Sequence, residues 1–222
     1  MNASLRPVRA VLFDLDGTFA DTAPDLGGAL NRQREARGLP PLPLEAIRPH
    51  ASAGARGLLR VGFGLAPGDP GYEALRDDFL ALYAAALCRE SRLFEGVPEL
   101  VGALEARGIA WGIVTNKAER FTLPLLEALG MRARAGCIVS GDACPQPKPH
   151  PAPLLAASAA LAIPPSACVY VGDDERDTQA SLAAGMQSVV ARYGYLGGRA
   201  WELWGAHAAI AAPLELLDLL PG

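Results

Sequence analysis

The chain has 222 residues, half of them hydrophobic, which suits one large domain or a domain with a smaller insertion and excludes a disordered protein. Twenty Lys and Arg residues against 24 Asp and Glu give a formal net charge of −4, so the composition favours neither a nucleic-acid-binding nor a membrane-surface protein. The apolar stretches are about ten residues long, too short to cross a bilayer. No signal-peptide core is present, so a cytoplasmic location is expected, and no motif indicates an oligomeric state.

The first hydrophobic run, residues 10–13, is short enough to be a strand buried on both faces. The next such run begins only at residue 109, far later than one crossover between parallel strands requires. Within this interval, residues 24–37, 55–61 and 72–88 have helical patterns separated by Gly- and Pro-rich loops. We therefore expect a helical cap domain at 21–94, inserted into a core formed by 1–20 and 95–222.

The rest of the chain alternates strand with helix. Hydrophobic runs at 109–114, 137–139, 168–171 and 188–191 predict strands, and segments at 97–107, 118–129, 151–161 and 178–184 predict helices. This alternation is typical of an α/β fold, in which a Rossmann-like parallel sheet carries helices on both faces. The apolar tail, 206–220, is expected to pack on this core.

Two carboxylates follow the first predicted strand. Ligands of parallel sheets bind beyond the carboxyl ends of the strands, where the sequence places Asp14-Leu15-Asp16-Gly17-Thr18. Asp14 and Asp16 can approach one site there, and Gly17 permits a tight turn. Because carboxylates this close repel each other unless a cation lies between them, the motif favours a metal site, and oxygen-only ligands favour Mg²⁺.

Polar residues also follow the other predicted strands. Thr115, Asn116 and Lys117 follow the second strand, Lys148 follows the third, and an acidic group at 173–177 follows the fourth. Each group alone is also compatible with a turn, a helix cap or a solvated charge. Together, in this order, they supply a nucleophile, a second carboxylate, a hydroxyl, a cation and metal ligands, which phosphoryl transfer requires.

Lysine is rare in this chain. Only Lys117 and Lys148 are lysines, while the other 18 of the 20 basic residues are arginines. Chance retention is one explanation. The other is that both positions require a compact ammonium where a planar guanidinium does not fit.

In these motifs and their order, the chain resembles the haloacid dehalogenase-like hydrolase superfamily, and within it the phosphatases with a helical cap inserted after the first motif. The resemblance implies Mg²⁺-dependent hydrolysis of a small-molecule phosphate ester, with Asp14 as the nucleophile that forms an aspartyl-phosphate and Asp16 as general acid and base. It also implies that Thr115 and Asn116 bind the phosphoryl oxygens and that Lys148 neutralises charge on Asp14 and the phosphate. The implied metal ligands are Asp14, the backbone carbonyl of Asp16, Asp173 and Asp177, the last of which alternatively pairs with Lys148.

Two acids bear on the comparison with the family, and one of them departs from its pattern. Asp174 stands where many relatives have Ser or Thr, so it either adjusts the metal site or caps the following helix. Dehalogenases of the superfamily lack the second carboxylate of the first motif. Because Asp16 is present here, dehalogenation is disfavoured.

The substrate is the least constrained part of this interpretation. The core motifs resemble those of phosphoglycolate phosphatases, whereas the tracts at 52–59 and 192–195 resemble a sister group that acts on N-acetylmuramic acid 6-phosphate. Arg56, at a Gly-rich helix start, can bind a carboxylate through two hydrogen bonds, and both substrates carry one. A solvated surface arginine is the alternative for Arg56.

Two other classes share part of this pattern. A sugar phosphomutase of the same superfamily needs a bisphosphate intermediate shielded from water. A phosphoaccepting receiver domain also combines acids, a Thr and a Lys on a parallel sheet, but receivers are only about half this long and take the phosphate on a different strand. A phosphatase acting on a small acidic phosphate ester, most similar to phosphoglycolate phosphatases, is therefore the expected function.

Overall fold

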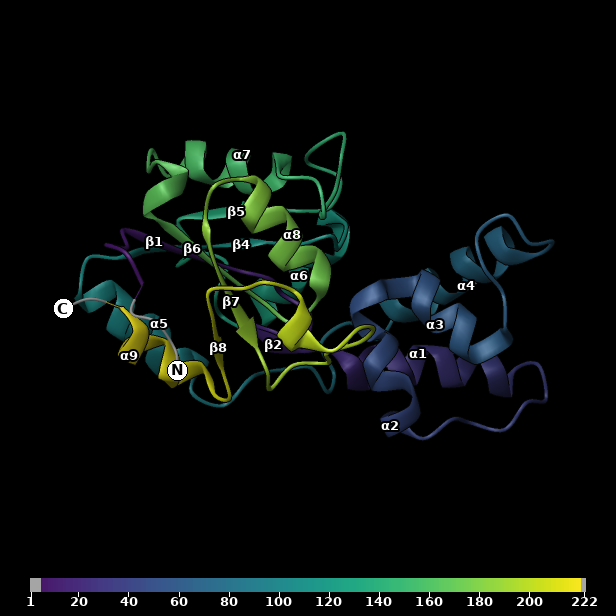
Figure 1. The fold of residues 1–222 in the computed structure, drawn as a ribbon. Coiled ribbons are helices and arrows are strands. Elements are labelled where there is room, and N and C mark those ends of the chain that lie inside the picture. The colour runs from purple at the N-terminus through teal and green to yellow at the C-terminus, as the bar shows by residue number, and fades with distance from the viewer. Residues whose placement is uncertain (1–4, 221–222) are drawn as a thin grey trace.

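The computed structural model describes residues 5–220 and contains an α/β core with a helical lobe beside it (Figure 1). The core has a six-stranded sheet in the order β5-β4-β1-β6-β7-β8, with every neighbouring pair parallel. Its strands are β1 (Ala10–Phe13), β4 (Ala110–Val114), β5 (Cys137–Val139), β6 (Cys168–Gly172), β7 (Gln187–Ala191) and β8 (Ala208–Ile210). The predicted parallel α/β sheet is confirmed, and β8 is an edge strand within the tail that was expected only to pack on the core.

Helices cover both faces of this sheet. One face carries α7 (Ala152–Ala160) and α8 (Glu175–Ala183), and the other carries α5 (Val97–Ala106), α6 (Glu119–Ala128) and α9 (Leu216–Leu219). Short 3₁₀ helices occur at Pro165–Ala167, Trp201–Leu203 and Pro213–Glu215. None of the helices within residues 5–220 combines the length and hydropathy needed to cross a bilayer.

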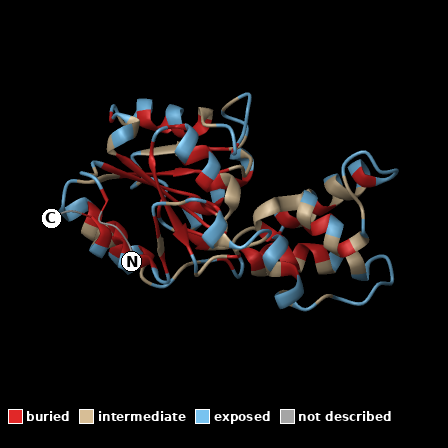
Figure 2. Ribbon diagram, viewed as in Figure 1, coloured by how far each residue is buried: buried red, intermediate tan, exposed pale blue. Residues whose placement is uncertain are grey.

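Burial on both faces explains the uninterrupted hydrophobic runs of the strands (Figure 2). Along β1, Val11 and Phe13 pack among residues of α5, α6 and α9, whereas Ala10 and Leu12 pack among residues of α7 and α8. β1 is also hydrogen-bonded between β4 and β6. The chain direction after Phe13 is therefore well defined, and with it the position of the residues that follow.

The helical lobe lies between β1 and α5 in the sequence. It comprises α1 (Ala23–Glu35), α2 (Leu44–Ile47), a 3₁₀ helix (Arg48–Ala53), α3 (Gly54–Phe63) and α4 (Tyr72–Ala84). A two-stranded antiparallel ribbon, β2 (Ala20–Asp21) with β3 (Arg92–Leu93), joins it to the core. The inserted helical cap is thus present. The domain boundaries expected from the sequence, 1–20 with 95–222 for the core and 21–94 for the cap, fall beside this ribbon and stay a prediction.

The cap has its own hydrophobic cluster, in which residues of α1, α3 and α4 meet. Two core residues, Phe121 of α6 and Tyr195, belong to the same cluster. The Tyr195 hydroxyl also accepts hydrogen bonds from the backbone N–H groups of Thr22 and Ala23, at 2.8 and 2.9 Å, where α1 begins. Apolar packing and these hydrogen bonds seat the cap over the carboxyl ends of the core strands.

Candidate active site

A cavity of about 270 Å³ lies between the cap and the core, where β1, β4 and β6 end. Residues that follow those strands form the core side, and residues of α1, α4 and the 48–55 segment form the cap side. Asp14, Asp16, Thr115, Asn116, Lys148 and Asp177 all line it. The structure therefore brings together at one cavity the groups that the sequence places at separate strand ends.

Asp14 follows β1 and is buried, with 8% of its surface exposed. Its backbone N–H donates to the carbonyl of Val171 on β6, at 2.9 Å, which continues the sheet pairing past the strand end. Gly17 then turns the chain with φ of +84°, and a Cβ there would lie 2.3 Å from Asp173 Oδ2. Gly17 is thus required both for the turn and for the close approach of Asp173.

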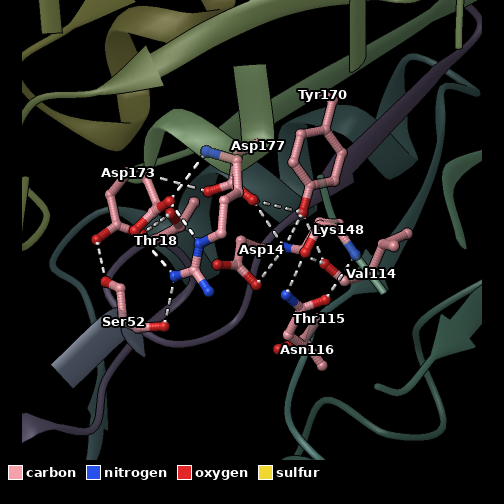
Figure 3. A network of polar contacts seen from close by, with 12 residues as sticks. Asp14, Thr18, Ser52, Val114, Thr115, Asn116, Lys148, Tyr170, Asp173 and Asp177 are labelled. Carbon is pink, nitrogen blue, oxygen red and sulfur yellow. Dashed lines mark hydrogen bonds and ion pairs between the residues drawn. The ribbon is translucent and has the colours of Figure 1, made fainter. Parts of the chain in front are cut away.

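Lys148 is surrounded by oxygen atoms (Figure 3). Its Nζ lies 2.9 Å from Asp14 Oδ1 and 2.7 Å from Asp177 Oδ1, and its side chain is 2% exposed. The ammonium also contacts the Val114 carbonyl at 3.1 Å and the Tyr170 hydroxyl at 2.6 Å. Burial alone would lower the pKa of Lys148, but the charges of Asp14 and Asp177 outweigh it and raise the pKa, so the ammonium stays charged.

Three buried carboxylates, from Asp14, Asp173 and Asp177, offer oxygen atoms that lie within 4.8 Å of one another. Asp173 accepts hydrogen bonds from the Thr18 hydroxyl at 2.9 Å and from the Ser52 hydroxyl at 3.0 Å. Burial, together with the charges of Asp14 and Asp177, raises the pKa of Asp173 well above its usual value. Three carboxylates beside one ammonium leave an excess of negative charge, and a donor set made of oxygen atoms fits a divalent cation such as Mg²⁺.

The Asp16 side chain lies outside this carboxylate cluster. Its Oδ1 accepts hydrogen bonds from the Thr22 hydroxyl and from Lys117 Nζ, the latter at 2.9 Å. Asp16 therefore faces the cap side of the cavity. A metal contact through its backbone carbonyl stays a prediction.

Thr115 and Asn116 follow β4. Thr115 is buried, lines the cavity, and accepts a hydrogen bond from the Lys117 backbone N–H at 3.2 Å. The Asn116 amide forms a reciprocal pair with the Lys148 backbone, in which both hydrogen bonds measure 2.9 Å. Asn116 thus fixes the loop that carries Lys148, while the binding of phosphoryl oxygens by Thr115 and Asn116 stays a prediction.

Arg56 occupies a different place from the other predicted residues. It is exposed and lines a second, more open cavity beside the first. Asn116, Lys148 and Arg176 border both cavities. A carboxylate bound by Arg56 would therefore lie in the second cavity, so its expected role stays a prediction for substrates that extend that far.

Several residues that contact this site have no motif of their own. Ser52 of the cap reaches Asp173, and its carbonyl accepts a hydrogen bond from Arg176 Nη2 at 2.8 Å. Tyr170 donates to the Val114 carbonyl at 2.7 Å while it contacts Lys148. A hydroxyl-bearing residue in the otherwise apolar β6 was an available signal for Tyr170. Ser52 begins the tract at 52–59, but that tract does not reveal its contact with Asp173, which depends on how the cap sits on the core.

Asp174 provides the N-cap of α8. It accepts from the Arg176 backbone N–H at 2.9 Å and, with Asp177, completes a capping box. Its carboxylate also pairs with the Arg176 guanidinium, at 2.7 Å from Nε and 2.9 Å from Nη2. Of the two alternatives for Asp174, helix capping is confirmed, and the residue is not a member of the carboxylate cluster.

Comparisons with known proteins agree with this geometry. A sequence model of the haloacid dehalogenase-like hydrolase family matches residues 11–191. The N-acetylmuramic acid 6-phosphate phosphatase of Pseudomonas aeruginosa is 41% identical over 214 residues, which cover 96% of this chain and 95% of that protein. The phosphoglycolate phosphatase of Xanthomonas campestris pv. campestris is 43% identical over 215 residues, which cover 96% of this chain and 97% of that protein.

A solved structure shows the same architecture over nearly the whole chain. The crystal structure of a protein from Haemophilus somnus 129PT, described as a predicted phosphoglycolate phosphatase, superimposes with a TM-score of 0.85 at 26% identity. The match covers 96% of this chain and 97% of that one. The chain therefore belongs to the haloacid dehalogenase-like hydrolase family and is a phosphatase within it.

Proposed function

We propose that this chain is a Mg²⁺-dependent phosphatase that hydrolyses a small acidic phosphate ester through a phosphorylated Asp14. The observation that carries this proposal is the contact of Lys148 Nζ with Asp14 Oδ1, at 2.9 Å, beside two further carboxylates at the cavity between cap and core. This arrangement supports a nucleophilic carboxylate held next to a fixed cation. The cytoplasmic location expected from the sequence stays a prediction.

The first half of the proposed reaction transfers the phosphoryl group. An oxygen of Asp14 attacks phosphorus, the bond between phosphorus and the ester oxygen breaks, and Asp16 donates a proton to the departing alcohol. Lys148, held by Asp14 and Asp177, stabilises the negative charge on the phosphoryl oxygens, to which Thr115 donates. This half leaves an aspartyl-phosphate and an ionised Asp16.

The second half returns the enzyme to its starting state. Asp16 takes a proton from a water molecule, whose oxygen attacks phosphorus and displaces the Asp14 carboxylate. Inorganic phosphate leaves, and Asp16 is again protonated. Asp14, Asp173 and Asp177, with the Asp16 backbone carbonyl, would hold the metal ion, which supplies positive charge that draws the phosphate to the carboxylates.

The size of the enclosed cavity supports a small substrate. A cavity of about 150 Å³ accommodates benzene, so about 270 Å³ accommodates a ligand of about ten non-hydrogen atoms. That is the size of 2-phosphoglycolate, the substrate named for the Xanthomonas relative. The preferred substrate class is therefore a phosphate ester of a short hydroxy acid.

N-acetylmuramic acid 6-phosphate is the second candidate, named for the Pseudomonas relative. It is too large for the enclosed cavity alone. The open second cavity, which shares Asn116, Lys148 and Arg176 with the first, could hold the rest of the sugar and bring its lactyl carboxylate toward Arg56. The two candidates thus differ in which cavity they use.

The test is release of inorganic phosphate in the presence of Mg²⁺, with kcat/KM compared for 2-phosphoglycolate and N-acetylmuramic acid 6-phosphate. Asp14→Asn, purified in parallel, controls for contaminating phosphatases. We expect 2-phosphoglycolate to be preferred by about a hundredfold. A preference for the amino sugar would reassign the substrate. Conversion of a sugar monophosphate to an isomer without phosphate release would establish a phosphomutase instead.

A further inference from the structure

Lys117, the second of the two lysines, is buried beside Asp16 at the edge of the enclosed cavity. Its side chain is 7% exposed, and its Nζ lies 2.9 Å from Asp16 Oδ1. Among residues 5–220, Asp16 is the only acceptor in hydrogen-bond geometry with this ammonium. Since an ammonium has three hydrogens to donate, Lys117 retains donor capacity toward the cavity.

Tyr83, from α4 of the cap, lies directly over Lys117. The ammonium is 4.6 Å from the centre of the Tyr83 ring, and Tyr83 is 1% exposed. Lys117 is close enough to influence the Tyr83 hydroxyl, yet no atom of the described residues meets hydrogen-bond geometry with that hydroxyl. Buried hydroxyls almost always have a partner, so one that lines a cavity without a partner points to a ligand.

The protonation states of the two groups suit an anionic ligand. Burial raises the pKa of Tyr83 to about 12, so the hydroxyl keeps its proton and can donate it in a hydrogen bond. The ion pair with Asp16, at 2.9 Å, stabilises the positive charge of Lys117. A charged donor and a neutral donor therefore lie side by side.

On the cap side of the cavity, the polar hydroxyl of Tyr83 is surrounded by apolar residues. The other side chains of this cap wall are largely apolar, among them Leu26, Phe79 and Leu80. An extended polar ligand has few partners on that wall. A ligand with one acceptor group placed next to Asp16 matches both the polar position and its apolar surroundings.

The position of Asp16 indicates which part of a substrate Lys117 and Tyr83 would contact. In the proposed reaction, Asp16 gives its proton to the ester oxygen, so the departing alcohol lies beside it. Lys117, in contact with the same carboxylate, then faces a group bonded directly to the ester carbon. In 2-phosphoglycolate that group is a carboxylate.

We propose that Lys117 and Tyr83 form the subsite that binds a carboxylate on the alcohol half of the substrate, next to the ester carbon. This inference rests on the proposed function, because Asp16 locates the alcohol only if it acts as the acid. Lys117 neutralises the carboxylate and Tyr83 donates a hydrogen bond to it. Arg56, which is exposed and lines the second cavity, is not part of this subsite.

The test compares two substrates that differ only in this group. Ethyl phosphate has the carbon skeleton of 2-phosphoglycolate without the carboxylate. We expect Tyr83→Phe to lower kcat/KM for 2-phosphoglycolate about tenfold, mainly through KM, and for ethyl phosphate less than about threefold. Lys117→Met should lower kcat/KM for 2-phosphoglycolate about a hundredfold, and again less for ethyl phosphate.

Thermal unfolding separates this role from a structural one. Within residues 5–220 no atom meets hydrogen-bond geometry with the Tyr83 hydroxyl, so Tyr83→Phe should leave the midpoint unchanged or higher while it lowers selectivity. Arg56→Ala is the matched control and should leave the ratio of the two kcat/KM values unchanged. Equal losses on both substrates in Tyr83→Phe and Lys117→Met, or a selective loss in Arg56→Ala instead, would overturn the subsite.

The same assays distinguish an error in the proposed function from an error in the subsite. If wild-type protein hydrolyses ethyl phosphate but does not prefer 2-phosphoglycolate, the phosphatase stands and the subsite is wrong. If it hydrolyses neither, the proposed substrate class is wrong, and binding of 2-phosphoglycolate by calorimetry still decides the subsite. Binding that weakens about tenfold in Tyr83→Phe supports the subsite, and no binding or equal binding contradicts it.

Discussion

The two lysines of this chain line one cavity and differ in how fully they are engaged. Lys148, on the core side, contacts two carboxylates, a backbone carbonyl and a tyrosine hydroxyl, all within 3.1 Å. Lys117, below Tyr83 of the cap, has one carboxylate partner and lies beside a tyrosine hydroxyl that has no partner in hydrogen-bond geometry within the described part of the chain. Lys148 is thus fully engaged in the free protein, whereas Lys117 and Tyr83, where the cap meets the core, retain unused donors.

This difference indicates that one set of residues carries out the phosphoryl transfer and another set selects the substrate. Groups that handle the phosphoryl transfer need fixed positions, because preorganised charges stabilise the transition state without rearrangement. Groups that recognise the alcohol must keep hydrogen-bonding capacity until the substrate arrives. The relatives with different substrate names are accordingly expected to differ around the cap side.

The largest expected effect comes from the core side. Asp14→Asn should lower kcat by at least about a thousandfold for every phosphate ester, because an amide does not act as the nucleophile. It also removes one of three clustered negative charges, so the thermal midpoint without metal should not fall. Asp218→Asn, on an exposed position of α9, is the control and should be normal in both assays. Substantial phosphate release by pure Asp14→Asn would contradict its role.

Arginine in place of each lysine tests the comparison directly. Lys148→Arg should lower kcat for phenyl phosphate by about a hundredfold, because a guanidinium does not fit among four close oxygen partners. Lys117→Arg should lower it by about tenfold at most, since that side chain borders open cavity space. Steady-state kinetics of the two variants checks this. Equal losses would show that the two lysines are equally constrained.

Metal binding should depend on the carboxylate cluster. Mg²⁺ at about a hundred times its dissociation constant should raise the free energy of unfolding of the wild type by about 2.7 kcal/mol. Asp173→Asn should remove most of this increase, because it takes one of three clustered carboxylates away. Chemical denaturation with and without Mg²⁺ measures both. An undiminished increase in Asp173→Asn would place the metal elsewhere.

The smallest effect is expected at Arg56. Arg56→Ala should change kcat/KM for 2-phosphoglycolate by less than about twofold, because the exposed guanidinium lines the second cavity. If N-acetylmuramic acid 6-phosphate is a substrate, its KM should rise by about tenfold in this variant. Parallel kinetics on the two esters gives the result. A large loss on 2-phosphoglycolate would show that its carboxylate reaches Arg56.

The site residues on the core side could be predicted from the sequence because they follow strands. Parallel strands place their carboxyl ends at one edge of the sheet, so identifying the strands is enough to bring Asp14, Thr115 and Asp173 together. The same reasoning located the inserted helices, since no crossover needs so long an interval. The edge strand β8 was missed because its run, Ala208–Ile210, is short and rich in alanine.

The site residues on the cap side could not be predicted from the sequence in this way. Tyr83 resembles any other aromatic residue on the buried face of a helix, and only the packing of α4 over α6 brings it above Lys117. Arg56 was a candidate from composition and local sequence, but the orientation of α3 turns it toward the second cavity. The scarcity of lysine did mark Lys117, although the sequence did not reveal its partner.

In the proposed reaction, Asp14 carries the phosphoryl group during turnover. Wild-type protein mixed with excess 2-phosphoglycolate and Mg²⁺, quenched in acid and digested, should yield the peptide that contains Asp14 with the added mass of one phosphoryl group. Asp14→Asn should yield none. Rapid phosphate release by wild type with the label absent from that peptide, or present on another, would contradict the account.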